Sequence, residues 1–441
     1  MPRFARLLPA LLIAALALVL GGRHFATRAE AVPLAGSPTQ APVAARVLPG
    51  IDTLQMRGFK ELKGKRVGLL THPAGVNSRG QSTVEVLRRA PGVKLVALFG
   101  PEHGIYGDAK ANVGITDQKD PRTGLPVYSL YGKTRRPTPQ MLAGVDTMVI
   151  DLQDLGVRSY TYISAMRYVI EECFKTGREV IVLDRPNPLG GLKVDGPPMD
   201  KEFMSYVGAY QVPYVYGLTI GELALMAKAT PGWLEVSEKE RKRGRLVVIP
   251  MTGWRRDMLW TDTGLTWRAT SPAIPDLSAA MGYPMTGLGC QLGGFVHGYG
   301  SSFPFRMLQY SGQKPELIRA ALIAEGIPGL DFDVLPFHQN GKAYRGVYVI
   351  VTDWNRLRPT ELSLHLMRLS AKWARLQGKP NPFAAASADQ ALLFNKHMGS
   401  KEFWDALVKD GERLDIGYFV RKWEAQAKAF QQQSRRFWLY R

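Results

Sequence analysis

The sequence predicts an α/β fold: a Rossmann-like domain with a doubly wound, mostly parallel sheet, followed by a smaller α+β domain. Short apolar runs alternate with helical segments between residues 65 and 250. The runs are apolar throughout, as are parallel strands that are covered on both faces. A Gly-rich stretch at residues 285–305 then interrupts the alternation. We therefore expect the first domain to span residues 46–305 and the second to span residues 306–441.

The strands and helices of both domains can be placed in order along the chain. The expected strands of the first domain are KRVGLLT (65–71), VKLVALF (93–99), DTMVIDL (146–152), EVIVLD (179–184) and RLVVIP (245–250). A helix should begin at Ser82 or Thr83, because either hydroxyl can cap a helix, and another should span residues 161–176. In the second domain we expect a strand over residues 346–353 and a long helix from about Thr360.

The N-terminus has the order of a secretory signal peptide. Arg3 and Arg6 precede an apolar run, and Ala29-Glu30-Ala31 offers a cleavage site. We expect residues 1–31 to be removed, residues 32–45 to form a flexible lead, and the protein to be exported to the periplasm or beyond the cell. The alternative is an uncleaved N-terminal anchor. No later segment of the sequence has the apolar length of a membrane span.

The charge of the chain indicates an anionic environment. The 441 residues carry a formal net charge of +19. Such a surplus suits nucleic acid or an acidic cell envelope, and plain solvated charge is the alternative. The basic residues are dispersed, and we expect the densest run, KERKRGR (239–245), in a surface turn. No zinc-finger spacing or RNA-binding motif accompanies them, so we expect no nucleic-acid partner.

Four polar clusters follow four of the predicted strands. They read THPAG (71–75), GPEHG (100–104), DLQDLGVRSYTY (151–162) and DRPNPLGG (184–191). Parallel strands end at one edge of their sheet, and ligands of open α/β sheets bind there. The side chains expected to converge are His72, Glu102, His103, Asp151, Asp154, Arg158, Asp184, Arg185 and Asn187. Any one of them alone could be a turn residue or a helix cap, but together they predict a binding cleft.

Two carboxylates near aromatic and amide groups suit the hydrolysis of glycosidic bonds. We expect Glu102 to be the general acid, a role that requires a carboxyl group protonated near neutral pH. Asp154 or Asp151 would be the second carboxylate. Tyr160 and Tyr162 offer flat faces for sugar rings, although both could simply pack in the core.

Several other chemistries remain open or have little support. Arg158 or Arg185 could hold an anionic substituent through a bidentate pair, or could pair with a neighbouring aspartate. The histidines and aspartates of the clusters are acceptable metal ligands, but they lack a metal-binding spacing, and two cysteines are too few for a structural zinc site. We find no G-x-S-x-G elbow and no G-x-G-x-x-G fingerprint, so neither a serine nucleophile nor a nucleotide cofactor is expected.

The clusters, in this order, resemble the NamZ-type exo-β-N-acetylmuramidases of glycoside hydrolase family 171, long catalogued as a domain of unknown function. The matching stretches are GLLTHPAGVNSRG, LFGPEHGIYGD, DLQDLGVRSYTYISAM, VLDRPNPLGG and the terminal FWLYR. The resemblance implies a Rossmann-like domain, a smaller C-terminal domain and a cleft between them. It also implies removal of N-acetylmuramic acid from the non-reducing ends of peptidoglycan fragments, without a cofactor.

The resemblance also implies roles for individual residues. Glu102 and His103 fall on the Glu-His pair of the family. The second motif is matched by Asp151, Gln153, Asp154, Arg158 and Tyr160, and the third by Asp184, Arg185 and Asn187. The Gly-rich stretch departs from the family, because Leu288 and His297 stand where glutamates are common and Cys290 stands where a threonine is common. His297 is our substrate-binding candidate there. The alternative functions are a non-catalytic cell-wall-binding protein and a metal-dependent hydrolase or deacetylase.

Overall fold

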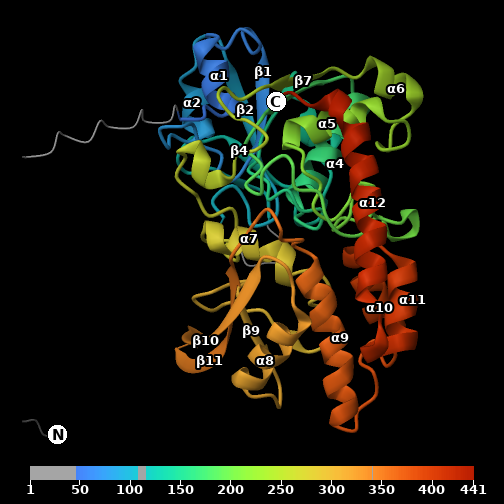
Figure 1. The fold of residues 1–441 in the computed structure, drawn as a ribbon. Helices are drawn as coiled ribbons and strands as arrows, with labels where there is room; N and C mark the ends of the chain where they lie inside the picture. Colours follow the sequence, from blue (N-terminus) through green and yellow to red (C-terminus); the bar gives the residue numbers. More distant parts are fainter. Residues whose placement is uncertain (1–45, 108–115, 340) are drawn as a thin grey trace, which may run out of the picture. The chain divides into compact units, whose positions relative to one another are not determined.

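The structure is a computed structural model that describes residues 46–107, 116–339 and 341–441 (Figure 1). The expected signal peptide and flexible lead lie outside the described residues, and both stay predictions. Within the described ranges, no helix combines the length and the apolar character that crossing a membrane requires.

A seven-stranded sheet organises the first half of the described chain. Its order is β3-β4-β2-β1-β5-β6-β7, and every neighbouring pair is parallel except β3 with β4 at one edge. The strands are β1 (Arg66–Thr71), β2 (Lys94–Gly100), β3 (Gln118–Lys119), β4 (Pro126–Ser129), β5 (Thr147–Asp151), β6 (Glu179–Leu183) and β7 (Leu246–Ile249). The predicted parallel sheet and its five expected strands are confirmed, and β3 and β4 are additional.

Both faces of this sheet are buried, which explains why its strands are apolar throughout. Successive residues of a strand point to opposite faces. On β5, Val149 packs in the cluster formed with α1 (Gly50–Met56) and α2 (Thr83–Arg88). Met148 and Ile150 pack in the cluster formed with α4 (Tyr162–Lys175) and α5 (Ile220–Ala229). Figure 1 shows these two helix pairs on either side of the strands.

The strand order creates a place for a ligand. β1 is central, with β2 and β4 on one side and β5, β6 and β7 on the other. The direction in which the chain winds therefore reverses between β1 and β5. Loops that leave two neighbouring strands in opposite directions open a crevice at the carboxyl edge of the sheet.

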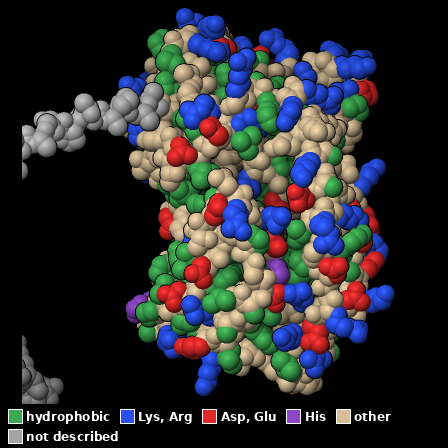
Figure 2. Space-filling view, in the orientation of Figure 1, with side chains coloured by type: hydrophobic (Ala, Val, Ile, Leu, Met, Phe, Trp, Pro, Cys, Tyr) green, Lys and Arg blue, Asp and Glu red, His purple; other side chains and the backbone are tan. Residues whose placement is uncertain are grey.

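The basic run at residues 239–245 corrects one prediction. It does not form a surface turn, because most of it lies in a helix, α6 (Glu238–Arg243). Ser237 and Glu240 form a capping box, and Glu, Lys and Arg are good helix formers. Its side chains stay outside the core, and Figure 2 shows Lys and Arg spread over the visible face rather than gathered in one stripe.

The second half contains a four-stranded antiparallel sheet of order β10-β11-β9-β8. Its elements are β8 (Phe295–Val296), β9 (Met307–Tyr310), β10 (Leu330–Gln339), β11 (Lys342–Val351), α7 (Leu277–Thr286), α8 (Pro315–Glu325) and α9 (Glu361–Leu376). The expected strand at 346–353 lies within β11, and the expected helix is α9, which follows Thr360. Strand β8 belongs to this sheet although it precedes residue 305; the domain boundary itself stays a prediction.

The C-terminal residues return to the first sheet. Helices α10 (Ala388–Met398), α11 (Lys401–Asp410) and α12 (Ile416–Ser434) precede the FWLYR tail; the short α3 (Pro139–Leu142) completes the α-helices of the described chain. The Tyr440 hydroxyl donates to Asp184 Oδ2 at 2.5 Å and accepts from the Met251 amide at 2.9 Å. The Leu439 amide donates to Glu222 Oε1 at 2.9 Å. These contacts hold the tail against the residues that follow β6 and β7.

Candidate active site

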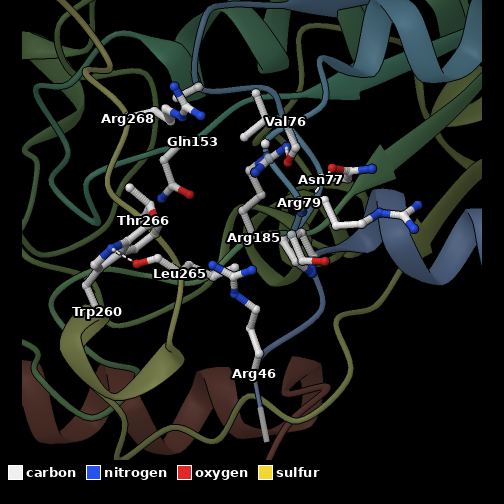
Figure 3. A pocket seen from close by; sticks show the side chains of 14 residues that line it. Arg46, Val76, Asn77, Arg79, Gln153, Arg185, Trp260, Leu265, Thr266 and Arg268 are labelled. Atoms are coloured by element: carbon white, nitrogen blue, oxygen red, sulfur yellow. Dashed lines mark hydrogen bonds between the residues drawn. The ribbon is translucent and has the colours of Figure 1, made fainter.

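A cavity of about 100 Å³ opens at the carboxyl edge of the first sheet, beside the point where the winding reverses (Figure 3). The loop between β1 and α2 forms one wall, and residues that follow β5 and β6 form another. Side chains that line it include Arg46, Asn77, Gln153, Arg185, Trp260 and Arg268. The wall after β1 is held in shape, because the Ser78 amide and hydroxyl both donate to Asp52 of α1, at 2.8 and 2.6 Å.

Arg185 is fixed in this cavity by a buried ion pair. Its Nε donates to Asp151 Oδ1 at 2.6 Å and its Nη2 to Oδ2 at 2.9 Å. Nη2 also donates to the Val76 carbonyl at 2.7 Å, and the Thr83 hydroxyl donates to Asp151. Asp151 is fully buried, so its carboxylate orients the arginine instead of facing the cavity.

His72 positions the neighbouring wall. Its Nε2 accepts a hydrogen bond from the Gln153 amide at 2.8 Å, which requires that nitrogen to be unprotonated. Burial, reinforced by the nearby Arg185 charge, lowers the pKa of His72 to about 3. His72 is therefore neutral at physiological pH. It holds the backbone of Gln153, whose side chain faces the cavity in Figure 3.

Glu102 lies in the turn after β2. The turn is tight, since His103 has φ +72° and is itself buried. Glu102 is partly exposed, and its Oε2 accepts from the Thr161 hydroxyl at 2.9 Å. The Tyr131 hydroxyl also hydrogen-bonds to it, and burial followed by this carboxylate raises the pKa of Tyr131. Tyr206 lies close by, with the Arg135 guanidinium 4.2 Å from its ring centre.

A series of contacts links Glu102 to the cavity. Thr161, which binds Glu102, precedes Tyr162, and the Tyr162 ring centre lies 4.8 Å from that of His72. His72 in turn holds Gln153 on the cavity. Neighbouring strands lie about 4.8 Å apart, so the ends of β2 and β5, two strands away, are separated by about 10 Å. One ligand of sugar size with an extended substituent can therefore touch both.

Asp154 is the other candidate carboxylate. It is buried, and burial raises its pKa to about 6 even though the Tyr216 hydroxyl and the Gly156 amide donate to Oδ2. Oδ1 has no hydrogen-bond partner among the described residues. Asp154 does not line the cavity, so it could act only on a ligand that reaches past Gln153.

The remaining sequence candidates hold the fold around the site. Arg158 is fully buried and donates to four carbonyls, those of Pro197, Val212, His397 and Met398. Tyr160 and Tyr162 are buried, and their hydroxyls donate hydrogen bonds to the side chain and the carbonyl of Thr270, respectively. This arrangement corresponds to the core-packing alternative for both residues.

Three further candidates also have protein partners. Asp184 accepts from Thr219, Gly221 and Tyr440, and burial raises its pKa to about 7. Asn187 bonds Leu218 and Leu189. His297 stacks on Phe305 at 5.0 Å in the second half, away from the cavity lining.

The structure adds residues that the sequence did not single out. Arg46, Trp260 and Arg268 line the cavity but belong to none of the four clusters. No local pattern marks them, because their position depends on contacts between distant segments. The described residues contain no group of three or more His, Cys, Asp or Glu side chains placed to hold a metal ion.

Comparisons with known proteins match the sequence and the fold of this chain. A family model described as the N-terminal part of exo-β-N-acetylmuramidase NamZ matches residues 67–278, and one for its C-terminal part matches residues 281–440. A protein of Bacillus subtilis (strain 168), named peptidoglycan β-N-acetylmuramidase NamZ, is 38% identical over 358 residues, which cover 80% of this chain and 84% of that protein.

Two solved structures from Bacteroides fragilis, both of DUF1343 family proteins, are also similar. The first has a TM-score of 0.79 and 38% identity, and the match covers 90% of this chain and 99% of the Bacteroides fragilis chain. The second has a TM-score of 0.62, 23% identity and the same coverage, and it shows the fold alone. The resemblance drawn from the four clusters is thereby confirmed, and this chain belongs to the NamZ family of exo-β-N-acetylmuramidases.

Proposed function

We propose that the protein is an exo-acting glycosidase that releases N-acetylmuramic acid from the non-reducing ends of peptidoglycan fragments. The name of the Bacillus subtilis relative supports the reaction class and the polymer. The observation that carries the proposal is the position of Glu102. It is the partly exposed member of the four candidate catalytic residues, and it follows β2 at the same edge of the sheet as the cavity, whereas His103, Asp151 and Asp154 are buried.

In this proposal Glu102 protonates the oxygen of the departing sugar. The hydroxyls of Thr161 and Tyr131 orient its carboxyl group. Asp151 forms a buried ion pair with Arg185, so we assign it the role of orienting that arginine. Asp154 is the proposed second carboxylate, because its Oδ1 is unpartnered among the described residues, and its pKa of about 6 leaves it ionised, as this role requires, at neutral pH. A second carboxylate either attacks the sugar or activates water.

The test is hydrolysis of a chromogenic β-N-acetylmuramide beside the matching N-acetylglucosaminide. We expect release from the muramide, and a loss of kcat/KM of about 10²–10⁴ in Glu102→Gln, the range associated with general acid catalysis. Glu316→Gln is the matched control, because Glu316 is an exposed carboxylate on α8. Release from neither sugar, or a Glu102→Gln variant as active as wild type, would contradict the proposal.

We also propose that the protein is exported, on the evidence of residues 1–31. Cell fractionation tests this directly. We expect the protein in the periplasm or medium with its N-terminus shortened to about residue 32, and a full-length cytoplasmic protein would refute it.

A further inference from the structure

We infer that Arg46, Arg185 and Arg268 form a subsite for the carboxylate of an acidic amino sugar and thereby set the choice of substrate. This inference rests on the proposed function, and it adds the group that the enzyme recognises and the residues that recognise it. Figure 3 shows Arg46 reaching into the cavity from one side, with Arg185 and Gln153 facing it and Arg268 on the other side.

Only part of the positive charge around the cavity is compensated. Four arginines and no acidic residue line it among the described residues. Arg185 is neutralised by Asp151, and Arg79 also extends along the neighbouring surface of α2. Arg46 and Arg268 form no ion pair with any described residue. The guanidinium of Arg268 also forms no hydrogen bond with a described residue. Guanidinium groups gathered without acids repel one another, and an anion bound between them removes that cost.

The backbone at Gly80 leaves room for the Arg268 side chain. A Cβ at Gly80 would lie 2.8 Å from Arg268 Nη2, and Gly80 has φ +80°. Glycine therefore both allows the turn and leaves room for the guanidinium over the loop. On Arg185, Nε and Nη2 are used by protein groups, whereas Nη1 has no hydrogen-bond partner among the described residues. The subsite thus offers nitrogen donors that the protein itself does not occupy.

Gln153 indicates that the ligand carries more than an anion. Its side chain is 1% exposed, and Nε2 is used by the carbonyls of Asp154 and Pro186. Oε1 is buried and has no partner among the described residues. An unmet buried acceptor is costly, so a ligand hydroxyl or amide N–H would be favoured beside it. Trp260 adds a flat apolar wall. The cavity thus suits a ligand with an acid, an O–H or N–H donor and an apolar face, and an acidic amino sugar carries all three.

Carboxylates and phosphates share the chemistry that guanidinium groups recognise. We commit to the carboxylate, because the proposed substrate, N-acetylmuramic acid, carries its acid on a lactyl substituent that extends from the ring. With the glycosidic bond at Glu102, that substituent would extend along the carboxyl edge of the sheet, from the end of β2 toward the arginines.

The test compares the acid with its neutral ester. The substrates are a chromogenic β-N-acetylmuramide and the lactyl methyl ester of the same compound. The variant is Arg46→Gln/Arg268→Gln, which changes two exposed side chains. A charge-assisted hydrogen bond contributes about 1.5–3 kcal/mol, so we expect the acid-to-ester ratio of kcat/KM to fall by 10- to 100-fold. Lys63→Gln/Lys94→Gln, exposed and near the opposite edge of the sheet, is the control with the same loss of charge and should keep the wild-type ratio.

Each outcome decides the inference. A wild-type ratio near one, or an equal loss on acid and ester in the arginine variant, overturns it and leaves the proposed function intact. Competitive inhibition by inorganic phosphate that is stronger than that by free N-acetylmuramic acid would assign the subsite to phosphate instead. If wild type hydrolyses neither sugar, the proposed function fails. Calorimetric binding of N-acetylmuramic acid to wild type but not to the arginine variant would then still support the subsite, and equal binding to both would refute it.

Discussion

Replacing Asp151 by Asn distinguishes a catalytic carboxylate from one that orients an arginine. The sequence allowed Asp151 as a catalytic partner of Glu102. In the structure its two oxygens accept from Arg185 Nε and Nη2, and the side chains of this pair are 0% and 4% exposed. An asparagine amide can accept at one oxygen only, and its NH₂ group would face an N–H of the guanidinium. Asp151→Asn therefore leaves a buried arginine without its counter-charge.

The expected cost follows from the burial of the pair. Removing one partner of a buried ion pair costs about 3–5 kcal/mol, and we expect the lower end because Arg185 borders a cavity that water can enter. Unfolding entropies near 2.1 cal/mol/K per residue convert 3 kcal/mol into a fall of about 3 °C in Tm for a chain of this size. Replacing both residues, as in Asp151→Asn/Arg185→Met, should recover part of that loss, since no charge is then left unpaired.

Urea unfolding followed by circular dichroism and by tryptophan fluorescence measures the cost, together with steady-state hydrolysis of the muramide. We expect Asp151→Asn to lose stability, and to raise KM because Arg185 is no longer held. A variant as stable as wild type to within about 1 kcal/mol, with kcat reduced by orders of magnitude and KM unchanged, would refute the orienting role and restore the catalytic one.

Three further changes test other contacts. The pKa of His72 is about 3 in the folded state against an ordinary 6.5, so its contribution to stability is complete above pH 6.5 and is lost as the pH falls toward 3. We expect His72→Gln to have a lower free energy of unfolding than wild type at pH 7. Urea unfolding should show this difference shrinking by several kcal/mol, at most about 5, when the pH is lowered to 3. Tyr440→Phe should lower the free energy of unfolding by about 2 kcal/mol at pH 8 and by about 1 kcal/mol at pH 5. The reason is that burial raises the pKa of Asp184 to about 7, so the hydrogen bond from Tyr440 to Asp184 is charge-assisted only above that pH. Gly75→Ala should lower both Tm and activity, because the new Cβ would lie 2.2 Å from the hydroxyl that ends β1; Gly144→Ala, with open space around it, should change neither.

Much of the fold could be predicted because its causes are local. A strand that is covered on both faces must be apolar, so β1, β2, β5, β6 and β7 are visible in the sequence. The mistaken turn at residues 239–245 had a local cause as well. A run of charges resembles a loop, but Ser237 followed three residues later by Glu240 is a helix start, and that pattern outweighs the charge.

The site was predictable only in part, because half of it is set by distant contacts. Arg46 and Arg268 are 222 residues apart in the chain and meet at one cavity. Asp184 was predicted as a ligand-binding residue, and its hydrogen bond with Tyr440, 256 residues away, could not be seen in the local sequence. Arg158 likewise binds carbonyls at the end of α10, which no pattern around residue 158 could reveal.

Hydrogen-bond partners explain which strand-end residues shape the loops and which face a ligand. Asp154 accepts from the amide of Gly156, and Asn187 from that of Leu189, each two residues ahead. This is the geometry of an Asx turn, so these side chains are needed to bend the chain whether or not a ligand binds. Gln153 has no such local donor for its Oε1 among the described residues, although it sits in the same cluster. A polar atom after a parallel strand is available to a ligand when neither the turn nor another residue occupies it, as with Gln153 Oε1 and with Asp154 Oδ1. By that criterion we propose that the substrate contacts the cavity wall at Gln153 and the arginines opposite.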